Sequence, residues 1–326
     1  MKISLLFRNP NSGNFSIENV FNTLKPYLGK CCNYQISSYS SSGFLNRLRI
    51  ILEAQNFKSM LVHVSGDITF TNLLLSKSVI TFHDFEFIHR AKGLKRAILK
   101  LFWVTLPAKR ATKITVISKA TEDALNKLVH VSQEKVQLIY NPITIKKESR
   151  PIQELKFGVD EYVLCIGTKK NKNLEAVIKI TQENKIKLLV LGELNSEQEL
   201  LIEDKALFQN LINVGEKELV YLYQQAAMLC FCSFEEGFGL PIVEAQYLGC
   251  PVITSNCSSM PEIAGDGAMF VDPYSSLDIK TAINMLFSNE NSRLDLIERG
   301  LENCKRFQPQ LIAQQYLDLY KEILGC

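Results

Sequence analysis

The chain has 326 residues, of which 46% are apolar and 22% are charged, a balance typical of a soluble globular protein with roughly two domains. The first residues lack the long apolar core of a signal peptide, and no apolar run reaches the length of a membrane-spanning helix, so we expect neither a secreted nor a spanning chain. The nine cysteines have no zinc-ligand spacing, which favours buried thiols in a reducing, cytosolic compartment.

Charge is distributed unevenly along the chain. Residues 1–150 contain 22 Lys and Arg against 9 Asp and Glu, whereas residues 151–326 contain 15 against 25. The first part is therefore strongly basic and the second part acidic, although the net charge is only +3. Opposite fields in the two parts favour two domains with different partners.

In the first half, short apolar runs alternate with segments of helical period. Strands are predicted at 2–7, 60–64, 78–82, 113–117 and 135–140. Helices are predicted at 16–28, 43–55, 92–106 and 119–130. Continuous apolar strands separated by helices indicate a parallel sheet that is covered on both faces.

The second half repeats this alternation. Strands are predicted at 161–166, 186–191, 227–232, 251–254 and 268–271. Helices are predicted at 173–183, 216–226, 241–249, 277–287 and 290–306. Two such series predict an α/β protein with two Rossmann-like domains.

A polar segment with two prolines, residues 141–154, separates the two series and predicts the linker. We therefore divide the chain into domains at 1–147 and 148–326, and a last helix at about 309–324 can pack back on the first domain. Ligands of open α/β sheets bind beyond the carboxyl ends of the strands. Two facing sheets therefore predict a site in the cleft between them.

The stretch "CFCSFEEGFGLPIVEAQYLGCPV" holds the most informative turn of the sequence. Its apolar start predicts a buried strand, and Pro241 suits the first turn of a helix that ends near Gly249. Gly237 and Gly239 let the backbone approach a ligand closely. Free N–H groups and the dipole at the helix start suit a phosphate. The third glycine of a dinucleotide fingerprint is absent, which argues against an oxidoreductase.

Two glutamates, Glu236 and Glu244, flank this turn. A carboxylate repels pyrophosphate, so neither is expected to contact the phosphates. Glu244, in the first helical turn, can accept two hydrogen bonds from a ribose diol, and Glu236 can accept hydrogen bonds from sugar hydroxyls. Ribose, diphosphate and sugar in that order describe a nucleotide-sugar. The alternative is a pair of solvated glutamates at a helix start, which the dipole alone would favour.

The stretch "EEGFGLPIVEAQYLGCPVITSNCSSMPEIAGDGAMFVDP" resembles the donor-site signature of glycosyltransferase family 4, in which seven residues separate two glutamates. The resemblance implies a retaining, nucleotide-sugar-dependent transferase with the GT-B fold, whose two Rossmann-like domains face each other across a cleft. It also implies that the first domain binds a glycan or polyprenyl-linked acceptor and that the second binds the donor, in cell-surface polysaccharide synthesis. Phe238 and Leu240 join the donor site by this match.

A second match, "CIGTKKNKNLEAVI", resembles the phosphate-binding segment of the same family. It implies that Lys172 neutralises the diphosphate, with Gly167 and Thr168 beside it. Many members carry an arginine in place of Thr168, so this chain lacks one positive charge of the pattern. The alternative for Lys172 is a solvated lysine in a basic loop. Its position after a strand and before Asn173, a candidate helix N-cap, favours the functional role.

Two further stretches extend the resemblance. "LINVGEKELVYLYQQA" resembles the loop that covers the nucleotide base, near Val214 and Gly215. "VITFHDFEF" resembles the His-Asp segment beside the transferred sugar, which implies that His83 faces the cleft and that Asp84 braces the loop. A satisfied core histidine is the alternative for His83.

The remaining acceptor-side candidates follow two predicted strands of the first domain. "LVHVSGDITF" ends a strand, so His63, Gly66 and Asp67 are candidates to line the acceptor side. "FRNPNSGNFSIENVF" replaces the glycine-rich loop that many family members place after the first strand. Arg8 and Asn14 in this stretch are candidates to face the donor phosphate or the acceptor, and Arg8 can equally be a surface charge.

The implied reaction moves a sugar from a nucleoside diphosphate to a hydroxyl, so the charge that grows on the departing diphosphate must be stabilised. Lys172 and the helix start at 239–241 are predicted to do this, with Glu236 and His83 as the other catalytic residues. The sequence has no Asp-x-Asp motif, so neither a metal nor another cofactor is expected to be required. Same-face attack by the acceptor, assisted by the leaving phosphate, is favoured over a protein nucleophile.

Other functions remain open at this stage. The first is a GT-B epimerase or phosphorylase that acts on a sugar nucleotide, and an activity test with the donor alone distinguishes an epimerase from a transferase. The second is a nucleotide-sugar-binding subunit without catalysis. Nucleic acid is not an expected partner, because the basic half lacks aromatic stacking runs and a known binding motif.

Residues 92–113 contain seven Lys and Arg and no acid. Apolar residues recur there at helical spacing, with the only tryptophan among them: Leu94, Ile98, Leu101, Phe102, Trp103 and Leu106. A basic amphipathic helix of this kind can lie on an anionic membrane surface. The alternative is a helix that packs on its own sheet with solvated lysines, which leaves the one-sided charge unexplained. We expect a cytoplasmic enzyme that can be peripheral on the cytoplasmic face of the inner membrane.

Overall fold

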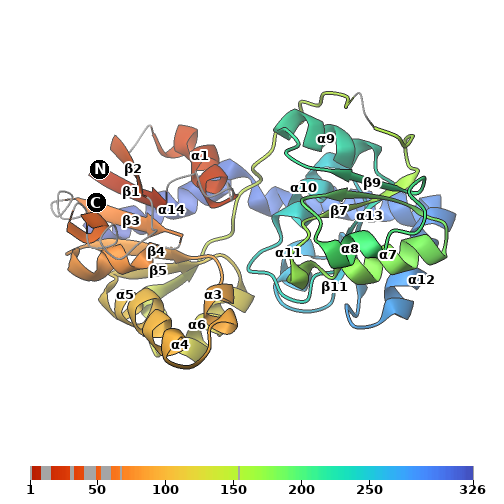
Figure 1. Ribbon diagram of the computed structural model, residues 1–326. Coiled ribbons are helices and arrows are strands. Elements are labelled where there is room, and N and C mark those ends of the chain that lie inside the picture. The colour runs from red at the N-terminus through yellow and green to blue at the C-terminus, as the bar shows by residue number, and fades with distance from the viewer. Residues whose placement is uncertain are drawn as a thin grey trace. The chain divides into compact units, whose positions relative to one another are not determined.

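The computed structural model describes residues 2–8, 16–29, 33–39, 49–52, 60–66, 68–152 and 155–325. The chain divides into two compact units, one made of residues 1–144 and 307–326 and the other of residues 145–306. Each unit contains a six-stranded parallel sheet flanked by helices (Figure 1). Among the described residues, no helix combines the length and the apolar character needed to cross a bilayer.

The first unit has the strand order β2-β1-β3-β4-β5-β6. The strands are β1 Lys2–Arg8, β2 Asn33–Tyr39, β3 Leu61–Ser65, β4 Ser78–Phe82, β5 Lys113–Val116 and β6 Val136–Leu138. The helices are α1 Ser16–Leu28, α3 Glu86–Arg90, α4 Gly93–Leu99, α5 Leu106–Arg110, α6 Lys119–Leu128 and α14 Pro309–Leu324. The chain reverses its direction of winding between β1 and β3, which places a ligand crevice at the carboxyl ends of these strands.

Strand β2 was not predicted, because "NYQISSY" has almost no apolar residue to mark it. It forms through its backbone, which pairs with β1 over the whole strand from Lys2–Asn33 to Arg8–Tyr39. The helix predicted at 43–55 lies mostly outside the described residues, of which 49–52 are helical. The helix predicted at 92–106 is confirmed as helical but continues to Arg110, with a π-helical turn at 100–105 between α4 and α5.

The last helix, α14, is part of the first unit. It packs against α1, and Figure 1 shows the two in blue and red. Tyr316 and Tyr320 of α14 are fully buried, and the ring of Tyr316 lies 5.5 Å from that of Phe21 in α1. The core of the first unit is therefore closed by a segment from the far end of the chain.

The second unit has the strand order β12-β11-β10-β7-β8-β9. The strands are β7 Tyr162–Ile166, β8 Lys187–Leu191, β9 Phe208–Leu211, β10 Met228–Phe231, β11 Val252–Ser255 and β12 Met269–Val271. The helices are α7 Leu174–Glu183, α8 Ser196–Leu200, α9 Glu216–Gln225, α10 Leu240–Leu248, α11 Met260–Ala264, α12 Ser276–Ser288 and α13 Glu290–Asn303. This is the order of dinucleotide-binding sheets, and its switch point lies between β7 and β10.

Sequence periodicity missed two kinds of element in the second unit. Strand β9, "FQNL", is short and half polar, so it has no apolar run. Helices α8 and α11 are five residues each, too short to show a 3.6-residue period. The polar linker predicted at 141–154 has neither helix nor strand in its described residues.

Candidate functional site

Two loops meet at the carboxyl edge of the second sheet, where β7 and β10 are neighbours. One loop follows β7 and contains residues 167–173, and the other follows β10 and contains residues 232–239. The backbone N–H of Phe234 donates to the carbonyl of Asn171 at 2.8 Å, which holds the loops side by side. The side chain of Asn171 adds a hydrogen bond to the carbonyl of Glu235 at 3.0 Å.

The first loop is built around the side chain of Lys172. Gly167 has a φ of +90°, and a Cβ atom there would lie 3.0 Å from Cε of Lys172. The backbone conformation therefore favours glycine, and a side chain here would also push the Lys172 side chain that lies across it. The hydroxyl of Thr168 donates to the carbonyl of Glu193 at 2.5 Å, so this residue braces the loop and supplies no charge.

Lys172 and Glu236 form an ion pair. Nζ of Lys172 lies 2.6 Å from Oε1 of Glu236, and the two side chains are only 18% and 14% exposed. Nζ also lies 4.5 Å from the ring centre of Phe231, and Nδ2 of Asn171 donates to the same Oε1 at 3.2 Å. An ammonium has three N–H donors, so Lys172 can hold Glu236 and still donate to a bound anion.

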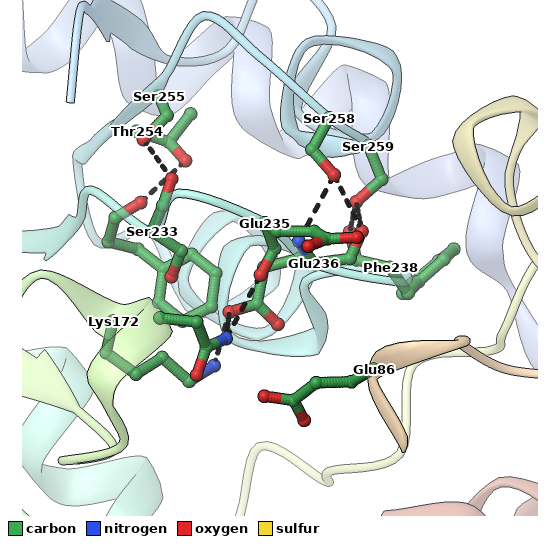
Figure 2. A network of polar contacts seen from close by, with 12 residues as sticks. Glu86, Lys172, Ser233, Glu235, Glu236, Phe238, Thr254, Ser255, Ser258 and Ser259 are labelled. Carbon is green, nitrogen blue, oxygen red and sulfur yellow. Dashed lines mark hydrogen bonds and ion pairs between the residues drawn. The ribbon is translucent and has the colours of Figure 1, made fainter. Parts of the chain in front are cut away.

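Figure 2 shows Lys172 pointing toward the carboxylate of Glu236, with two serines on the other side of the Glu236 loop. The hydroxyl of Ser258 accepts from the N–H of Glu236 at 3.1 Å and donates to its carbonyl at 2.9 Å. The hydroxyl of Ser259 lies 3.0 Å and 2.8 Å from the carbonyls of Glu236 and Phe238. We did not assign these serines from the sequence, although "SNCSSMPE" belongs to the family signature.

Helix α10 begins at the end of this loop, as the proline predicted. Its N-cap, Gly239, has a φ of +102° and provides no side chain to cap the helix, and a proline follows in the first turn. Uncapped N–H groups at a helix start carry a partial positive charge and suit an anion. The partly buried ammonium of Lys172 and this helix start are positive groups of the loop pair that an anion could contact.

Glu244 lies in α10, one turn further on, and is 8% exposed. The hydroxyl of Tyr223, from α9, donates to its Oε2 at 3.0 Å. Burial, followed by the negative charge of Glu244, raises the pKa of Tyr223 well above its usual value, so the tyrosine stays a donor. Tyr223 thus orients the carboxylate, and the assignment of Glu244 to a ribose stays a prediction.

Asn173 corrects one detail of the sequence reading. It occupies the N-cap position of α7 with a left-handed φ of 55°, but its side chain does not cap the helix. Its amide donates instead to the carbonyl of Pro273 at 2.7 Å. The longer-range bond wins because the left-handed backbone points the side chain away from the helix start.

The same loop pair contains two buried polar atoms that have no partner among the described residues, Oδ1 of Asn171 and Oγ of Ser233. Buried polar atoms are rarely left unpaired. These two atoms therefore indicate that a polar ligand binds at this edge of the sheet. Val214 and Gly215 lie beyond β9 at the start of α9, where the N–H of Gly215 donates to Oε2 of Glu218 at 2.9 Å. Their assignment to the base stays a prediction.

In the first unit, a small pocket of about 20 Å³, partly open to solvent, lies beyond β3 and β4. Its walls contain Gly66, Thr69, Thr81, Phe82, His83, Asp84, Phe87 and Trp103. Nε2 of His83 lies 2.9 Å from the hydroxyl of Ser65, so His83 is partly satisfied and still reaches the pocket. Oδ1 of Asp84 accepts from the N–H of Glu86 at 3.1 Å, which confirms that it braces the loop.

The assignment of His63 to the acceptor side was wrong. His63 is fully buried; Nδ1 lies 2.6 Å from the hydroxyl of Tyr320 and Nε2 lies 2.7 Å from that of Thr81. It is a core histidine under α14, so it cannot contact an acceptor. Asn14 and Asp67 lie outside the described residues, and of Arg8 only the backbone, at the end of β1, is described.

The buried histidine predicts an acid-sensitive core. Burial, and secondly the nearby His83, lowers the pKa of His63 from 6.5 to about 3. The unfolded chain therefore binds a proton below about pH 6.5 that the folded chain refuses until about pH 3, so stability falls with falling pH in that window. We expect a loss of about 1 kcal/mol per pH unit from this group.

Chemical denaturation of His63→Gln and of the wild type between pH 7 and pH 5 measures this slope. The variant is less stable at pH 7, because it loses contacts to Tyr320 and Thr81, but its slope is flatter. The control is the same substitution at His130, which is exposed in the same unit. Equal slopes for wild type and His63→Gln contradict the prediction.

The basic segment at 92–113 contradicts the reading in which its apolar face packs on the sheet, and it departs from the amphipathic reading at Trp103. Leu94, Ile98, Leu101 and Phe102 are 77%, 46%, 43% and 42% exposed, so this stripe does not pack on the sheet of its own unit. Trp103, which we had placed in the stripe, instead packs on Phe70 with 5.0 Å between ring centres. The tryptophan therefore belongs to the pocket wall and not to the exposed face.

The sequence of this chain is similar to those of known proteins. A family model described as glycosyl transferases group 1 matches residues 146–303, and one described as Glycosyltransferase Family 4 matches residues 27–147. The O-antigen chain mannosyltransferase of Salmonella typhimurium is 28% identical over 263 residues, which cover 77% of this chain and 69% of that protein.

A second relative, from Campylobacter jejuni, is an alpha-1,4-N-acetyl-D-galactosaminyltransferase whose name gives a PP-undecaprenol-linked saccharide as its acceptor. It is 28% identical over 202 residues, which cover 58% of this chain and 55% of that protein. Among solved structures, Anabaena HepE in complex with UDP and glucose has a TM-score of 0.80 at 15% identity, over 99% of this chain and 100% of that chain.

Two parallel-sheet Rossmann-like units make up the GT-B fold. The two family models together match residues 27–303. The chain is therefore an enzyme of the hexosyltransferase kind, and the two matches support a glycosyltransferase of the family 4 type. No group of three His, Cys, Asp or Glu side chains within the described ranges is arranged to hold a metal ion.

Proposed function

We propose that this enzyme transfers a hexose from a nucleoside-diphosphate sugar to a hydroxyl of a glycan or lipid-linked saccharide, with retention of anomeric configuration, in cell-surface polysaccharide synthesis. The observation that carries the proposal is the Lys172–Glu236 ion pair, at 2.6 Å, next to the uncapped start of α10. In this proposal Lys172 is the positive group for the diphosphate, and Glu236 beside it is the carboxylate for the sugar hydroxyls.

In the proposed reaction, the bond between the anomeric carbon and the diphosphate oxygen breaks while the acceptor oxygen bonds to the same face of the sugar. The acceptor hydroxyl loses its proton to the departing diphosphate. Lys172 and the N–H groups at the start of α10 stabilise the charge that grows on that leaving group. Glu236 has two functions, since it orients Lys172 and accepts hydrogen bonds from the sugar.

Because protein groups neutralise the diphosphate in this proposal, activity is expected to persist when divalent cations are removed by a chelator. Tyr223 and Glu244 bind the ribose, and the start of α9 near Gly215 covers the base. His83 in the first unit contributes to the sugar side of the reaction. Each role follows from the family resemblance together with the hydrogen bonds described above.

The test is a panel of nucleotide-sugars, first by ligand-dependent thermal shift and then by transfer to saccharide acceptors. UDP-glucose belongs in the panel because HepE was solved with UDP and glucose, and mannose donors belong in it because the Salmonella typhimurium relative is a mannosyltransferase. NMR of the product then reports the anomeric configuration. Inversion overturns the retaining mechanism, donor conversion without acceptor indicates an epimerase, and binding without turnover indicates a non-catalytic subunit.

We also propose that the basic segment at 92–113, with its exposed apolar side chains, holds the enzyme reversibly on an anionic membrane surface on the cytoplasmic side. Lys92, Lys95, Arg96 and Lys100 form no ion pair within the described parts of the chain, and four large apolar side chains beside them are exposed. Lys113 differs, since it pairs with Glu322 at 2.7 Å. A basic amphipathic surface of this kind attracts anionic lipid.

Charge reversal of Lys92, Lys95, Arg96 and Lys100 to glutamate is expected to abolish co-flotation with anionic vesicles at low salt, because each basic residue near the surface contributes about 1 kcal/mol. The matched control reverses four other exposed lysines of the first unit, at 25, 77, 119 and 127, which changes the net charge equally. Equal loss in both variants shows a non-specific charge effect. Failure of the wild type to float excludes the membrane proposal.

A further inference from the structure

Trp103 is the only tryptophan of the chain, and the structure gives it a place that the sequence did not indicate. It lies in the π-helical turn Lys100–Thr105, two positions after the exposed Leu101. Residues two positions apart on a helix point to nearly opposite sides. Leu101 therefore faces outward, whereas Trp103 faces the pocket beyond β3 and β4.

The tryptophan is held firmly in this place. Its ring packs on Phe70, and the hydroxyl of Thr69 donates to its backbone carbonyl at 2.6 Å. Interruptions of an α-helix by a π turn are often found at functional sites. Here the six-residue turn Lys100–Thr105 contains both the outward-facing Leu101 and the inward-facing Trp103.

The pocket has the composition that binds a sugar ring. Phe82, Phe87 and Trp103 supply aromatic walls, while His83 and Asp84 supply polar atoms at the same opening. The C–H groups on one face of a pyranose stack on an aromatic ring, and its hydroxyls require hydrogen-bond partners. The space inside the pocket is only about 20 Å³, so a sugar ring can lie across its opening but not inside it.

We propose that Trp103 is a specificity-determining residue that stacks on the sugar residue of the acceptor. The acceptor is then a saccharide whose terminal pyranose lies across the opening of this pocket, and not a bare lipid phosphate or a protein side chain. This inference rests on the proposed transferase function, because it names the acceptor class of that reaction.

The single tryptophan makes the protein its own reporter. Emission excited selectively from tryptophan comes only from Trp103, so its intensity and its quenching by acrylamide report on the pocket. The probes are methyl glycosides of mannose, glucose, galactose, N-acetylglucosamine and N-acetylgalactosamine, each titrated to saturation. At least one is expected to change the emission and to protect Trp103 from acrylamide, while UDP and GDP alone do not.

Two results overturn the inference. In the first, no methyl glycoside changes the emission or the quenching of Trp103. In the second, anionic vesicles with brominated lipids quench Trp103 directly, which places the indole in the membrane and not in the pocket. Phe102→Ala is the matched control for the titration, because the neighbouring ring is exposed and its loss leaves the response to the glycosides unchanged.

Steady-state kinetics provide a second readout that does not depend on fluorescence. Trp103→Leu is expected to raise KM for the saccharide acceptor by roughly tenfold, the scale of a lost aromatic contact, with little change in KM for the donor. Trp103→Phe keeps a ring for packing on Phe70 and is expected to retain most of the affinity. Equal acceptor KM values in Trp103→Leu and the wild type also overturn the inference.

The two proposals fail in different ways. If transfer from a nucleotide-sugar is observed but no saccharide changes the emission or quenching of Trp103, the transferase proposal holds and the acceptor contacts other residues. If no nucleotide-sugar binds or reacts, the transferase proposal fails, whatever the emission of Trp103 shows.

Discussion

Replacing Lys172 by methionine is expected to lower kcat by roughly 100-fold to 1000-fold, the scale measured when one charge-stabilising group is removed from an active site. The ammonium is 18% exposed and already oriented by Glu236, so it does not have to reorganise when the diphosphate leaves. Charge on the leaving group is greater in the transition state than in the bound donor. The loss therefore falls on kcat as well as on affinity.

Lys170→Met is the matched control, because Lys170 lies on the same turn with an exposed side chain and no assigned contact. It is expected to keep kcat near the wild-type value. Thermal unfolding of both variants shows whether the Glu236 carboxylate, left without its ion-pair partner, destabilises the fold. Normal kcat with a raised donor KM in Lys172→Met shows that the lysine provides uniform binding instead.

Glu244→Ala is expected to weaken binding of both the donor and the free nucleoside diphosphate by roughly 1.5–3 kcal/mol, the contribution of a charged hydrogen-bonding group. The carboxylate is 8% exposed and receives a hydrogen bond from Tyr223 at 3.0 Å, so its position is determined before the ligand arrives. Isothermal titration with UDP and GDP measures the loss.

Two companion variants separate contact from position. Tyr223→Phe leaves Glu244 in place but removes its orienting donor, so a smaller loss of nucleotide affinity is expected. Glu203→Ala removes an exposed acid of the same unit and is expected to leave the affinity unchanged. If Glu244→Ala binds UDP and GDP as tightly as the wild type does, Glu244 does not bind the ribose.

Most of the parallel sheets could be predicted from the sequence, because each buried strand is a continuous apolar run. Strands β7 and β10, which carry the two site loops, are of this kind. Strand β2 could not be predicted, because its polar residues form a strand only through pairing with β1. The start of α10 could be predicted from a glycine and a proline, whose backbone preferences are local.

The resemblance to family 4 assigned Gly167, Glu236, Gly239 and Glu244 to one donor site, and that assignment stays a prediction. The sequence could not show that Glu236 pairs with Lys172, since 64 positions separate them and only the adjacency of β7 and β10 brings them together. Nor could it show the Ser258 and Ser259 contacts, which depend on the neighbouring strand β11.

The sequence by itself determined most of the elements, the two sheets and the glycine and proline turn before α10, because apolar period, glycine freedom and proline geometry act over a few residues. Only the tertiary structure decided which polar groups are buried and which reach a ligand. The sequence placed His63 in the site, but in the structure it is buried and its ring contacts Tyr320, 257 positions away. The sequence placed Trp103 on the membrane-facing stripe, but in the structure it packs on Phe70 and lines the pocket. Both outcomes depend on packing between distant segments, which a local pattern of residues does not contain.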